Sequence, residues 1–402
     1  MERAKGIHKI SGVAFPMARI DERLIVAIVP FWMDLSSSIF YLAAPLIVIE
    51  LGGNPVELGL IGTMTAAVHM TLANLGGRLS DRLGRRILMV AGPFIFAVSC
   101  LLTTQATEVF HILALAGLNG IGMAIFWPSF QAWVADSPAG SNLARNIGSF
   151  NMSWTASQFI GPTLSGFLFS LHPRVPFWTA AALSFLLFFL LRASVSDQGP
   201  QPAKGEATPP WGTDDSDGGM GFLYAVWIAN FASWFILGNL RYQFPKLARD
   251  LAISPSTIGL LLSCVGLSQF LGFFFLRGSD RWHFKKSYLL GAQSLSASAL
   301  LLIFFFPQKL IFALAFTLIG LSASLTYYSS LYYSVRLLKR KGKGTGLHES
   351  ILGSGVVLGP ILGGVAALSI SPRAPYALCL AILALAAVME LSFTGSRRLP
   401  RR

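Results

Sequence analysis

Two acidic residues lie inside long apolar segments of the chain, where an ionised side chain is costly. Asp34 lies ten residues into the apolar segment 24–49. A helical rise of 1.5 Å per residue places it about 15 Å deep, near the middle of a hydrocarbon core roughly 30 Å thick. Ser38 and Tyr41 follow it at i+4 and i+7, so we expect one polar helix face that looks inward. A carboxyl group at that depth can take up and release a proton; the alternative is a permanent salt bridge or hydrogen bond, for example with His69.

Glu349 is the second candidate for a proton-carrying group. It lies beside His348, about one turn into the apolar segment 346–369. A carboxylate there can instead cap the N-terminus of its helix, and both interpretations stay open. Its counterpart 198 residues earlier is Asn151, which begins a polar stripe that also contains Gln158.

Amide and aromatic side chains inside other apolar segments complete the set of candidate cavity residues. They are Asn119, Trp127 and Gln131; Asn230 and Trp234, with Arg241 expected near the outer mouth; and Tyr328 in the group Tyr327, Tyr328, Tyr332 and Tyr333. Aromatic walls with a few polar groups suit an amphipathic organic ligand. The alternative is a belt of aromatic residues at the membrane interface.

The elements that position these residues are membrane-spanning helices. The chain is 53% hydrophobic and only 12% charged, and its mean hydropathy is +0.61. Many apolar stretches reach the ~20 residues that a helix needs to cross a bilayer. We predict twelve spans, at 24–49, 56–76, 87–105, 109–133, 146–170, 175–193, 221–243, 256–276, 287–306, 309–335, 346–369 and 374–393.

The spans divide six and six around a polar stretch rich in proline and glycine. The fold expected is an all-α membrane protein, with twelve transmembrane helices in two pseudo-symmetric six-helix bundles. We predict an N-terminal bundle over 1–193, a cytoplasmic linker over 194–220 and a C-terminal bundle over 221–402.

The net charge of +13 raises the question of nucleic-acid binding, but its placement argues against it. With the N-terminus inside, most of the 31 lysines and arginines lie on the cytoplasmic side. This predicts a multi-pass protein of the plasma (inner) membrane with both termini in the cytoplasm, in contact with anionic lipid and with no nucleic-acid partner.

A glycine pattern occurs twice in the chain with the same offsets. The full copy is Gly346, Gly355, Gly359, Pro360, Gly363 and Gly364; the other, 198 residues earlier, is Gly148, Ser157, Gly161, Pro162, Ser165 and Gly166. Such a long-period repeat indicates one unit built twice, which in a membrane protein is typical of a transporter with its site between the halves. The four-residue spacing also makes grooves in which another helix can pack closely.

The loop expected between the second and third spans combines glycines with charges. We expect Gly77 to end the second helix and Gly84 to allow the turn into the third. Asp81 is an acid among bases and can pair with Arg82, Arg85 or Arg86, or lie at a helix N-terminus. Positive charge that only sets topology explains the arginines equally well, but it does not explain the aspartate.

This segment, 77–86, resembles the signature loop of the major facilitator superfamily. The resemblance implies two six-helix bundles that rock about a central cavity, with Gly77, Asp81, Arg82, Gly84, Arg85 and Arg86 as a cytoplasmic latch in the outward-facing state. The spaced glycines resemble the fifth-helix motif of that superfamily, which implies sliding contacts between the halves; static tight packing is the alternative. Proton-coupled exporters of this superfamily usually have an arginine in the fourth span, and residues 111–133 contain none.

We therefore expect a secondary active transporter of a small organic solute that works by alternating access as a monomer. The first hypothesis is a proton-coupled carrier that exports amphipathic compounds; a uniporter or a metabolite importer is the alternative. A non-transporting membrane receptor on the same scaffold is the rival from another class. No phosphate-binding loop, nucleophile constellation or metal cluster is visible in the sequence, so we expect no enzyme, no cofactor and no metal.

Overall fold

The computed structural model describes residues 22–136, 143–195, 217–276, 281–338 and 341–395. Twelve α-helices account for nearly all of these residues, and the described part contains no strand. The helices are α1 (Glu22–Glu50), α2 (Pro55–Leu83), α3 (Arg85–Thr103), α4 (Val109–Asp136), α5 (Leu143–Leu171), α6 (Val175–Ser194), α7 (Asp217–Asp250), α8 (Pro255–Leu276), α9 (Lys286–Phe305), α10 (Lys309–Leu337), α11 (Lys341–Ser369) and α12 (Ala374–Gly395). The predicted all-α fold is confirmed. By length and composition, eleven of these helices, as far as they are described, can cross a membrane; α5 is not among the eleven.

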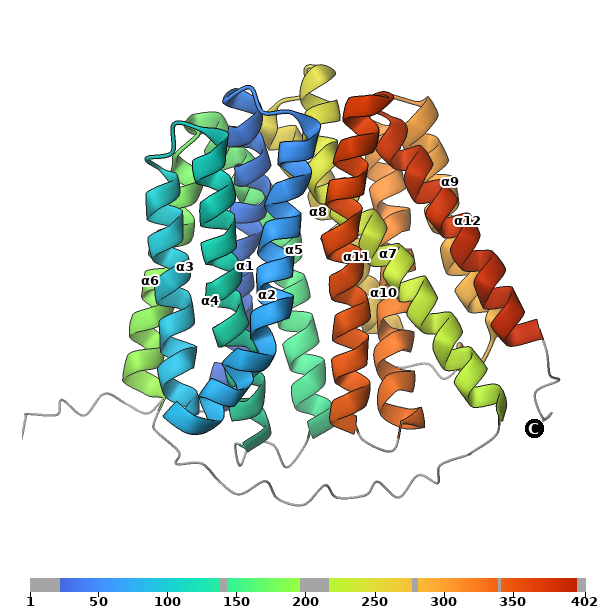
Figure 1. The fold of residues 1–402 in the computed structure, drawn as a ribbon, viewed down its shortest axis with the longest axis horizontal. Coiled ribbons are helices and arrows are strands. Elements are labelled where there is room, and N and C mark those ends of the chain that lie inside the picture. Colours follow the sequence, from blue (N-terminus) through green and yellow to red (C-terminus); the bar gives the residue numbers. More distant parts are fainter. Residues whose placement is uncertain (1–21, 137–142, 196–216, 277–280, 339–340, 396–402) are drawn as a thin grey trace, which may run out of the picture.

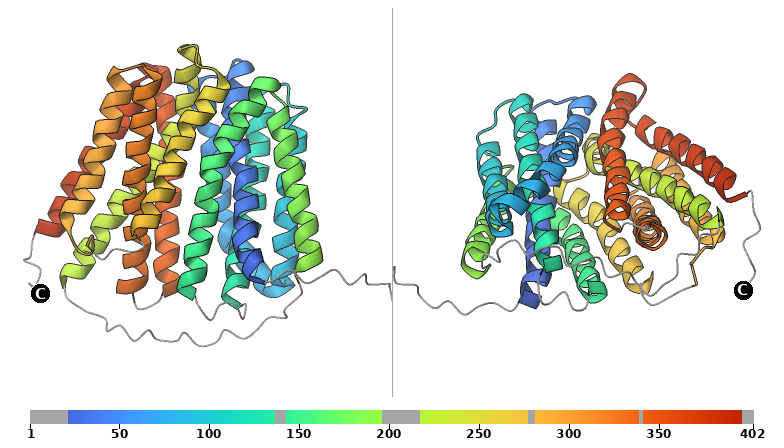
Figure 2. Two further views of the ribbon diagram at one scale, coloured as in Figure 1. Left: turned by 180° about the vertical axis from the view of Figure 1, so that it is seen from behind. Right: turned by 60° about the horizontal axis from the view of Figure 1, so that its bottom comes forward.

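The helices form two groups that lie side by side. Within the first group α2 packs on α4, α3 on α4 and α6, and α1 on α5; within the second, α10 packs on α8 and α7 packs on α11 and α12. The right view of Figure 2 shows α1–α6 on one side and α7–α12 on the other. Most of the predicted linker, residues 196–216, lies outside the described residues, so the domain boundaries stay a prediction.

Each group has its own buried aromatic core. In the first group the ring of Phe40 packs edge-on against Phe96 and Phe177, at centroid distances of 6.0 and 5.8 Å. In the second group Phe244 packs edge-on against Phe312 and Phe316 at 5.2 and 4.6 Å. Such pairs add about 0.5–1.5 kcal/mol beyond the burial of their area.

The two groups meet through α2 on α11 and α5 on α8 (Figure 1). A Cβ atom added at Gly59 of α2 would clash with the carbonyl group of Pro360 in α11, and one at Gly364 of α11 would clash with that of Pro55 in α2. Side chains larger than glycine would therefore push the helices apart.

The same contact recurs on the other side of the molecule. A Cβ atom at Gly259 of α8 would clash with the Pro162 carbonyl of α5, and one at Gly166 of α5 would clash with that of Pro255 in α8. All four helices thus place a proline and a glycine four residues apart in the contact. This recurrence is what a duplicated architecture produces.

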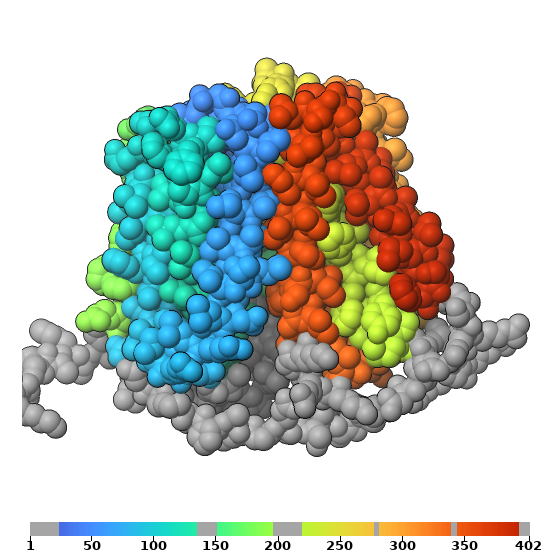
Figure 3. All heavy atoms as spheres, viewed as in Figure 1, coloured from blue at the N-terminus to red at the C-terminus, as the bar shows by residue number. Residues whose placement is uncertain are grey.

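These contacts lie toward the end of the molecule where α2 and α8 begin, here named the Pro55 end. The opposite end, where α2 stops, is named the Gly84 end. Figure 3 shows α2 and α11 in contact over the upper part of the molecule, toward the Pro55 end, and diverging below. Gln243 of α7 adds a tie at the Pro55 end, because its amide donates to the Pro55 carbonyl (3.0 Å) and the Pro360 carbonyl (3.1 Å).

The predicted glycine surfaces pack within their own halves. Gly161 of α5 lies against Ser38 of α1, while Gly355 and Gly359 lie against the α7 backbone near Phe231 and Phe235. Gly363 lies against the side chain of Asn239 in α7. The tight-packing alternative describes these glycines. Gly166 and Gly364, the last members of the two patterns, lie instead in the contacts between the halves described above, where sliding was expected. Gly148 lies in the first turns of α5, outside the described side chains.

The predicted loop 77–86 is also wrong in its boundaries, because α2 continues to Leu83 and α3 begins at Arg85. The glycine pair at 76 and 77 does not end the helix. A Cβ atom at Gly76 would clash with the Ala124 carbonyl of α4, so this glycine allows close packing. Only Gly84 lies outside both helices, at φ +96°, a conformation that favours glycine and makes the turn as predicted.

Candidate functional site

A cavity of about 380 Å³ lies between the two halves. Its lining comes from α1, α2, α4 and α5 on one side and from α7, α8, α10 and α11 on the other. The predicted candidates that line it are Asp34, Ser38, Tyr41, Trp127, Gln131, Gln158, Trp234 and Glu349. Spacing on single helices therefore pointed to residues that the fold brings together from several different helices.

Asp34 is half-buried on the cavity wall, and its carboxylate accepts one long hydrogen bond from the described residues. The hydroxyl of Ser37 donates to Asp34 Oδ1 at 3.4 Å, while the same hydroxyl also donates to the Met33 carbonyl at 3.0 Å. His69 lines the same cavity, but no hydrogen bond or ion pair among the described residues joins it to Asp34. The alternative of a permanent bond to His69 is therefore absent from this conformation.

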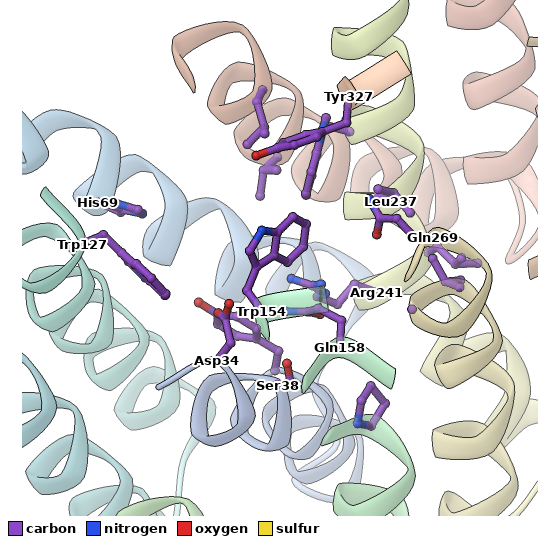
Figure 4. Close-up of a pocket in the computed structure, with 18 of the residues that line it drawn as sticks. Asp34, Ser38, His69, Trp127, Trp154, Gln158, Leu237, Arg241, Gln269 and Tyr327 are labelled. Carbon is purple, nitrogen blue, oxygen red and sulfur yellow. Dashed lines mark hydrogen bonds between the residues drawn. The ribbon is translucent and has the colours of Figure 1, made fainter. Parts of the chain in front are cut away.

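Arg241 of α7 supplies the positive charge of the cavity. Its guanidinium donates to Gln158 Oε1 of α5 at 2.8 Å, and it lies over the Tyr41 ring of α1 at 5.1 Å from the centroid. It is also close enough for its charge to act on the Asp34 carboxylate. Figure 4 shows Asp34, Gln158 and Arg241 pointing into one space.

Arg241 is the residue that the sequence interpretation undervalued, because it was expected near an outer mouth. A basic residue inside a span was the signal that could have found it. The fourth span lacks an arginine, and α7 places one in the cavity instead.

Aromatic rings from both halves form part of the apolar lining, beside aliphatic side chains such as Leu237 and Leu262. Trp154 of α5 meets Tyr327 of α10 edge-on at 5.8 Å between centroids, and Tyr327 lies 6.1 Å from Trp234 of α7. Tyr327, not Tyr328, faces the cavity; Tyr328 packs against Trp282 at 5.6 Å. Neighbouring residues on a helix point about 100° apart, so only one of two adjacent tyrosines can face the cavity. The sequence did not show which one.

Three amide candidates lie outside the cavity lining. Asn119 and Asn230 are completely buried within α4 and α7, and neither side chain has a hydrogen-bond partner among the residues that the structure describes. Asn151 Oδ1 accepts a 3.2 Å hydrogen bond from the Trp154 indole and so holds that ring in place. A helical stripe gives the side of a helix that a residue occupies, but not how far along the helix the cavity extends.

Glu349 of α11 lines the cavity and is exposed to it. The helix begins at Lys341, eight residues earlier, so Glu349 lies beyond the first turn and the cap interpretation is wrong. His348 beside it is completely buried; its Nδ1 lies 2.8 Å from Ser330 Oγ, and its ring meets Tyr327 edge-on.

Two bonds of the charged residues around Gly84 join described residues of the same half. Asp81 pairs with Arg85 across the turn. Arg86 donates to the Arg192 carbonyl of α6 at 2.7 Å. Among the described residues, no group of three or more His, Cys, Asp or Glu side chains could hold a metal ion.

Two six-helix halves around a cavity in a membrane-spanning chain define the architecture of a membrane transporter. The family model of the Major Facilitator Superfamily matches residues 26–223 and 226–402, and the chain belongs to this family. It is a multi-pass membrane protein and a transporter, which confirms the expected family and the expectation that the chain is not an enzyme.

Two bacterial relatives are similar in sequence. Multidrug resistance protein 1 of Bacillus subtilis (strain 168) is 26% identical over 342 residues, which cover 80% of this chain and 83% of that protein. Quinolone resistance protein NorA of Staphylococcus aureus is 25% identical over 153 residues, which cover 38% of this chain and 39% of NorA.

Solved structures with low sequence identity share the fold. The nucleoside transporter NupG gives a TM-score of 0.71 at 13% identity and covers 94% of this chain and 100% of its own. A bacterial homolog of the human lysosomal transporter Spinster, inward-facing and occupied, gives 0.70 at 15% identity and covers 94% and 97%.

Proposed function

We propose that this transporter exports amphipathic organic compounds in exchange for protons, with Asp34 as the proton-carrying group. The observation that carries the proposal is the cavity itself, which Asp34 of one half and Arg241 of the other both line. A carboxyl group with one long hydrogen bond is not fixed in its ionised form by its neighbours. The relatives named for multidrug and quinolone resistance support an amphipathic cargo.

Charge in the cavity couples proton binding to the movement of the halves. While Asp34 is ionised, it attracts Arg241 and holds α1 near α7; a proton on Asp34 removes that attraction. A ligand shifts the equilibrium between two conformations when it binds one of them more tightly than the other. A proton and a solute that both change this contact therefore act on the same equilibrium. Glu349, at the cavity surface of α11, is the second proton-carrying candidate.

The rocking motion needs two states of the contacts at the Pro55 end and at the Gly84 end. We propose that the segment 77–86, with Asp81, Arg82, Arg85 and Arg86, bonds to the other half when the Gly84 end closes. The positive-inside pattern of the sequence supports a cytoplasmic position for that end. The plasma (inner) membrane location and the monomeric state belong to the same proposal.

Transport by purified protein in proteoliposomes tests the proposal. Ethidium, an amphipathic cation, and norfloxacin, a quinolone with keto and carboxylate groups, are suitable fluorescent probes. We expect an imposed pH gradient to drive accumulation of at least one of them, with collapse on adding a protonophore. Transport down the solute gradient that ignores pH would favour the uniporter. Saturable binding without transport would favour the receptor.

A further inference from the structure

Within the described part of the chain, three residues that line the cavity carry buried polar atoms without a hydrogen-bond partner. They are the hydroxyl of Ser38 in α1, the indole nitrogen of Trp234 in α7 and the amide nitrogen of Gln269 in α8. Ser38 is 2% exposed and Gln269 is 4% exposed, so bulk solvent does not reach them freely. Figure 4 places Ser38 and Gln269 on the walls of the cavity beside Arg241.

Unpaired polar atoms lower the stability of a folded protein, and most native structures avoid them. Other unpaired atoms in this chain, such as the Ser184 hydroxyl, lie away from the cavity. Ser38, Trp234 and Gln269 come from both halves, and all three residues line the same cavity. A bound molecule that pairs with them would remove their cost.

The chemistry of these atoms defines the group that complements them. An indole N–H and an amide NH₂ only donate hydrogen bonds, and a hydroxyl can donate. The Arg241 guanidinium nearby also only donates. The matching partner is an oxygen that accepts hydrogen bonds, while the rings of Trp127, Trp154 and Tyr327 suit a flat apolar body.

We propose that Ser38, Trp234 and Gln269 form a donor subsite that binds a carbonyl or carboxylate oxygen of the transported compound. The substrate class is then an amphipathic molecule with a flat apolar body and one such oxygen group. This inference rests on the proposed transport function and names the chemistry of its cargo. Because the three residues belong to both halves, the oxygen group also joins the halves when it binds.

Binding by purified protein in detergent tests the subsite with three naphthalene compounds of similar size. The probes are 2-naphthamide, which has a neutral carbonyl group, 2-naphthoate, which has a carboxylate, and 2-isopropylnaphthalene, which matches the amide in shape and has no acceptor. Ligand-induced shifts of the unfolding temperature at several concentrations give each Kd. We expect the amide and the carboxylate to bind at least about tenfold more tightly than the hydrocarbon.

Three conservative variants each remove one donor: Ser38→Ala, Trp234→Phe and Gln269→Met. We expect each to weaken binding of 2-naphthamide by about tenfold and to leave 2-isopropylnaphthalene unchanged. Ser184→Ala is the matched control, because it removes another buried, unpaired hydroxyl that does not line the cavity. Without ligand, Ser38→Ala and Ser184→Ala should both keep or raise the unfolding temperature, since each removes an unsatisfied group.

The subsite is overturned if wild-type protein binds the amide no better than the hydrocarbon, or binds neither. It is also overturned if the donor variants bind the amide as wild type does, which is the result expected where water alone fills the cavity. Failure of the transport proposal gives a different result: the binding pattern holds, but no pH-driven accumulation occurs in proteoliposomes.

Discussion

The guanidinium of Arg241 in α7 donates a 2.8 Å hydrogen bond to the amide oxygen of Gln158 in α5, and so joins the two halves inside the cavity. A hydrogen bond with one charged partner is worth about 1.5–3 kcal/mol. It competes with the attraction between Arg241 and Asp34. Arg241 can therefore interact with the neutral Gln158 or with the ionisable Asp34, and protonation of Asp34 should change the balance between the two.

A double-mutant cycle on this pair tests whether the contact exists in solution. Arg241→Met and Gln158→Met should each lower the unfolding temperature, and the double variant should lose less than the sum, with a coupling of about 1 kcal/mol or more. The measurement is thermal unfolding in detergent. Additive effects would mean that the two side chains do not interact.

The glycine contact at the Pro55 end should not tolerate a methyl group. In Gly364→Ala the new Cβ atom meets the α2 backbone at Pro55 and Val56, so the two halves must separate there. Overpacking of this kind costs about 1–3 kcal/mol. We expect labelling of a cysteine placed at Thr63, which donates to the Val357 carbonyl across the contact, to rise at least severalfold.

The control for that experiment is Gly346→Ala in the same helix, because a Cβ atom at Gly346 meets nothing within 4 Å. Cys264, the half-buried native cysteine, is replaced by serine in all variants to remove background labelling. Equal labelling of the Gly364 and Gly346 variants would contradict the arrangement of α2 against α11.

Gln243 should contribute to the same closed state through hydrogen bonds. Gln243→Met keeps the side-chain length but leaves the carbonyl groups of Pro55 and Pro360 without this donor. We expect a loss of about 1–3 kcal/mol of stability. The Thr63 cysteine should also become more accessible. An unfolding temperature and labelling rate equal to those of the wild type would show that the tie is not formed.

The pair of Asp81 and Arg85 should matter little for stability in this conformation. The Asp81 side chain is 63% exposed, and an exposed i, i+4 pair is worth less than about 1 kcal/mol. We expect Asp81→Asn to leave the unfolding temperature nearly unchanged while it slows transport, because the proposed latch acts in the other state. A large loss of stability would contradict this division of roles.

Helical periodicity and the cost of burying polar groups were enough to predict which face of a single helix is polar. Asp34, Ser38 and Tyr41 share one face because the helical repeat requires it, and the cavity lies on that face. The choice of Tyr328 over Tyr327 failed because a group of four tyrosines leaves the direction of each ring undetermined. Which helices approach one another depends on contacts between the halves, and no single segment encodes these.

The same limit explains the segment at 77–86. Gly77 was expected to end the second helix, because glycine weakens helices. In the fold, close approach to α4 uses Gly76 and α2 continues to Leu83. Arg241 was visible as a charge in a span, but its bond to Gln158 depends on how α5 meets α7.

The most direct test of the central claim compares two transport modes of Asp34→Asn in proteoliposomes. Asparagine matches aspartate in shape but does not take up or release a proton at the pH of the assay. Solute exchange without a pH gradient should therefore continue, while pH-driven accumulation is lost. Asp250→Asn, which changes an acid outside the cavity, should behave as wild type. If Asp34→Asn still accumulates solute in response to a pH gradient, Asp34 is not the coupling group and the account of the cavity is wrong.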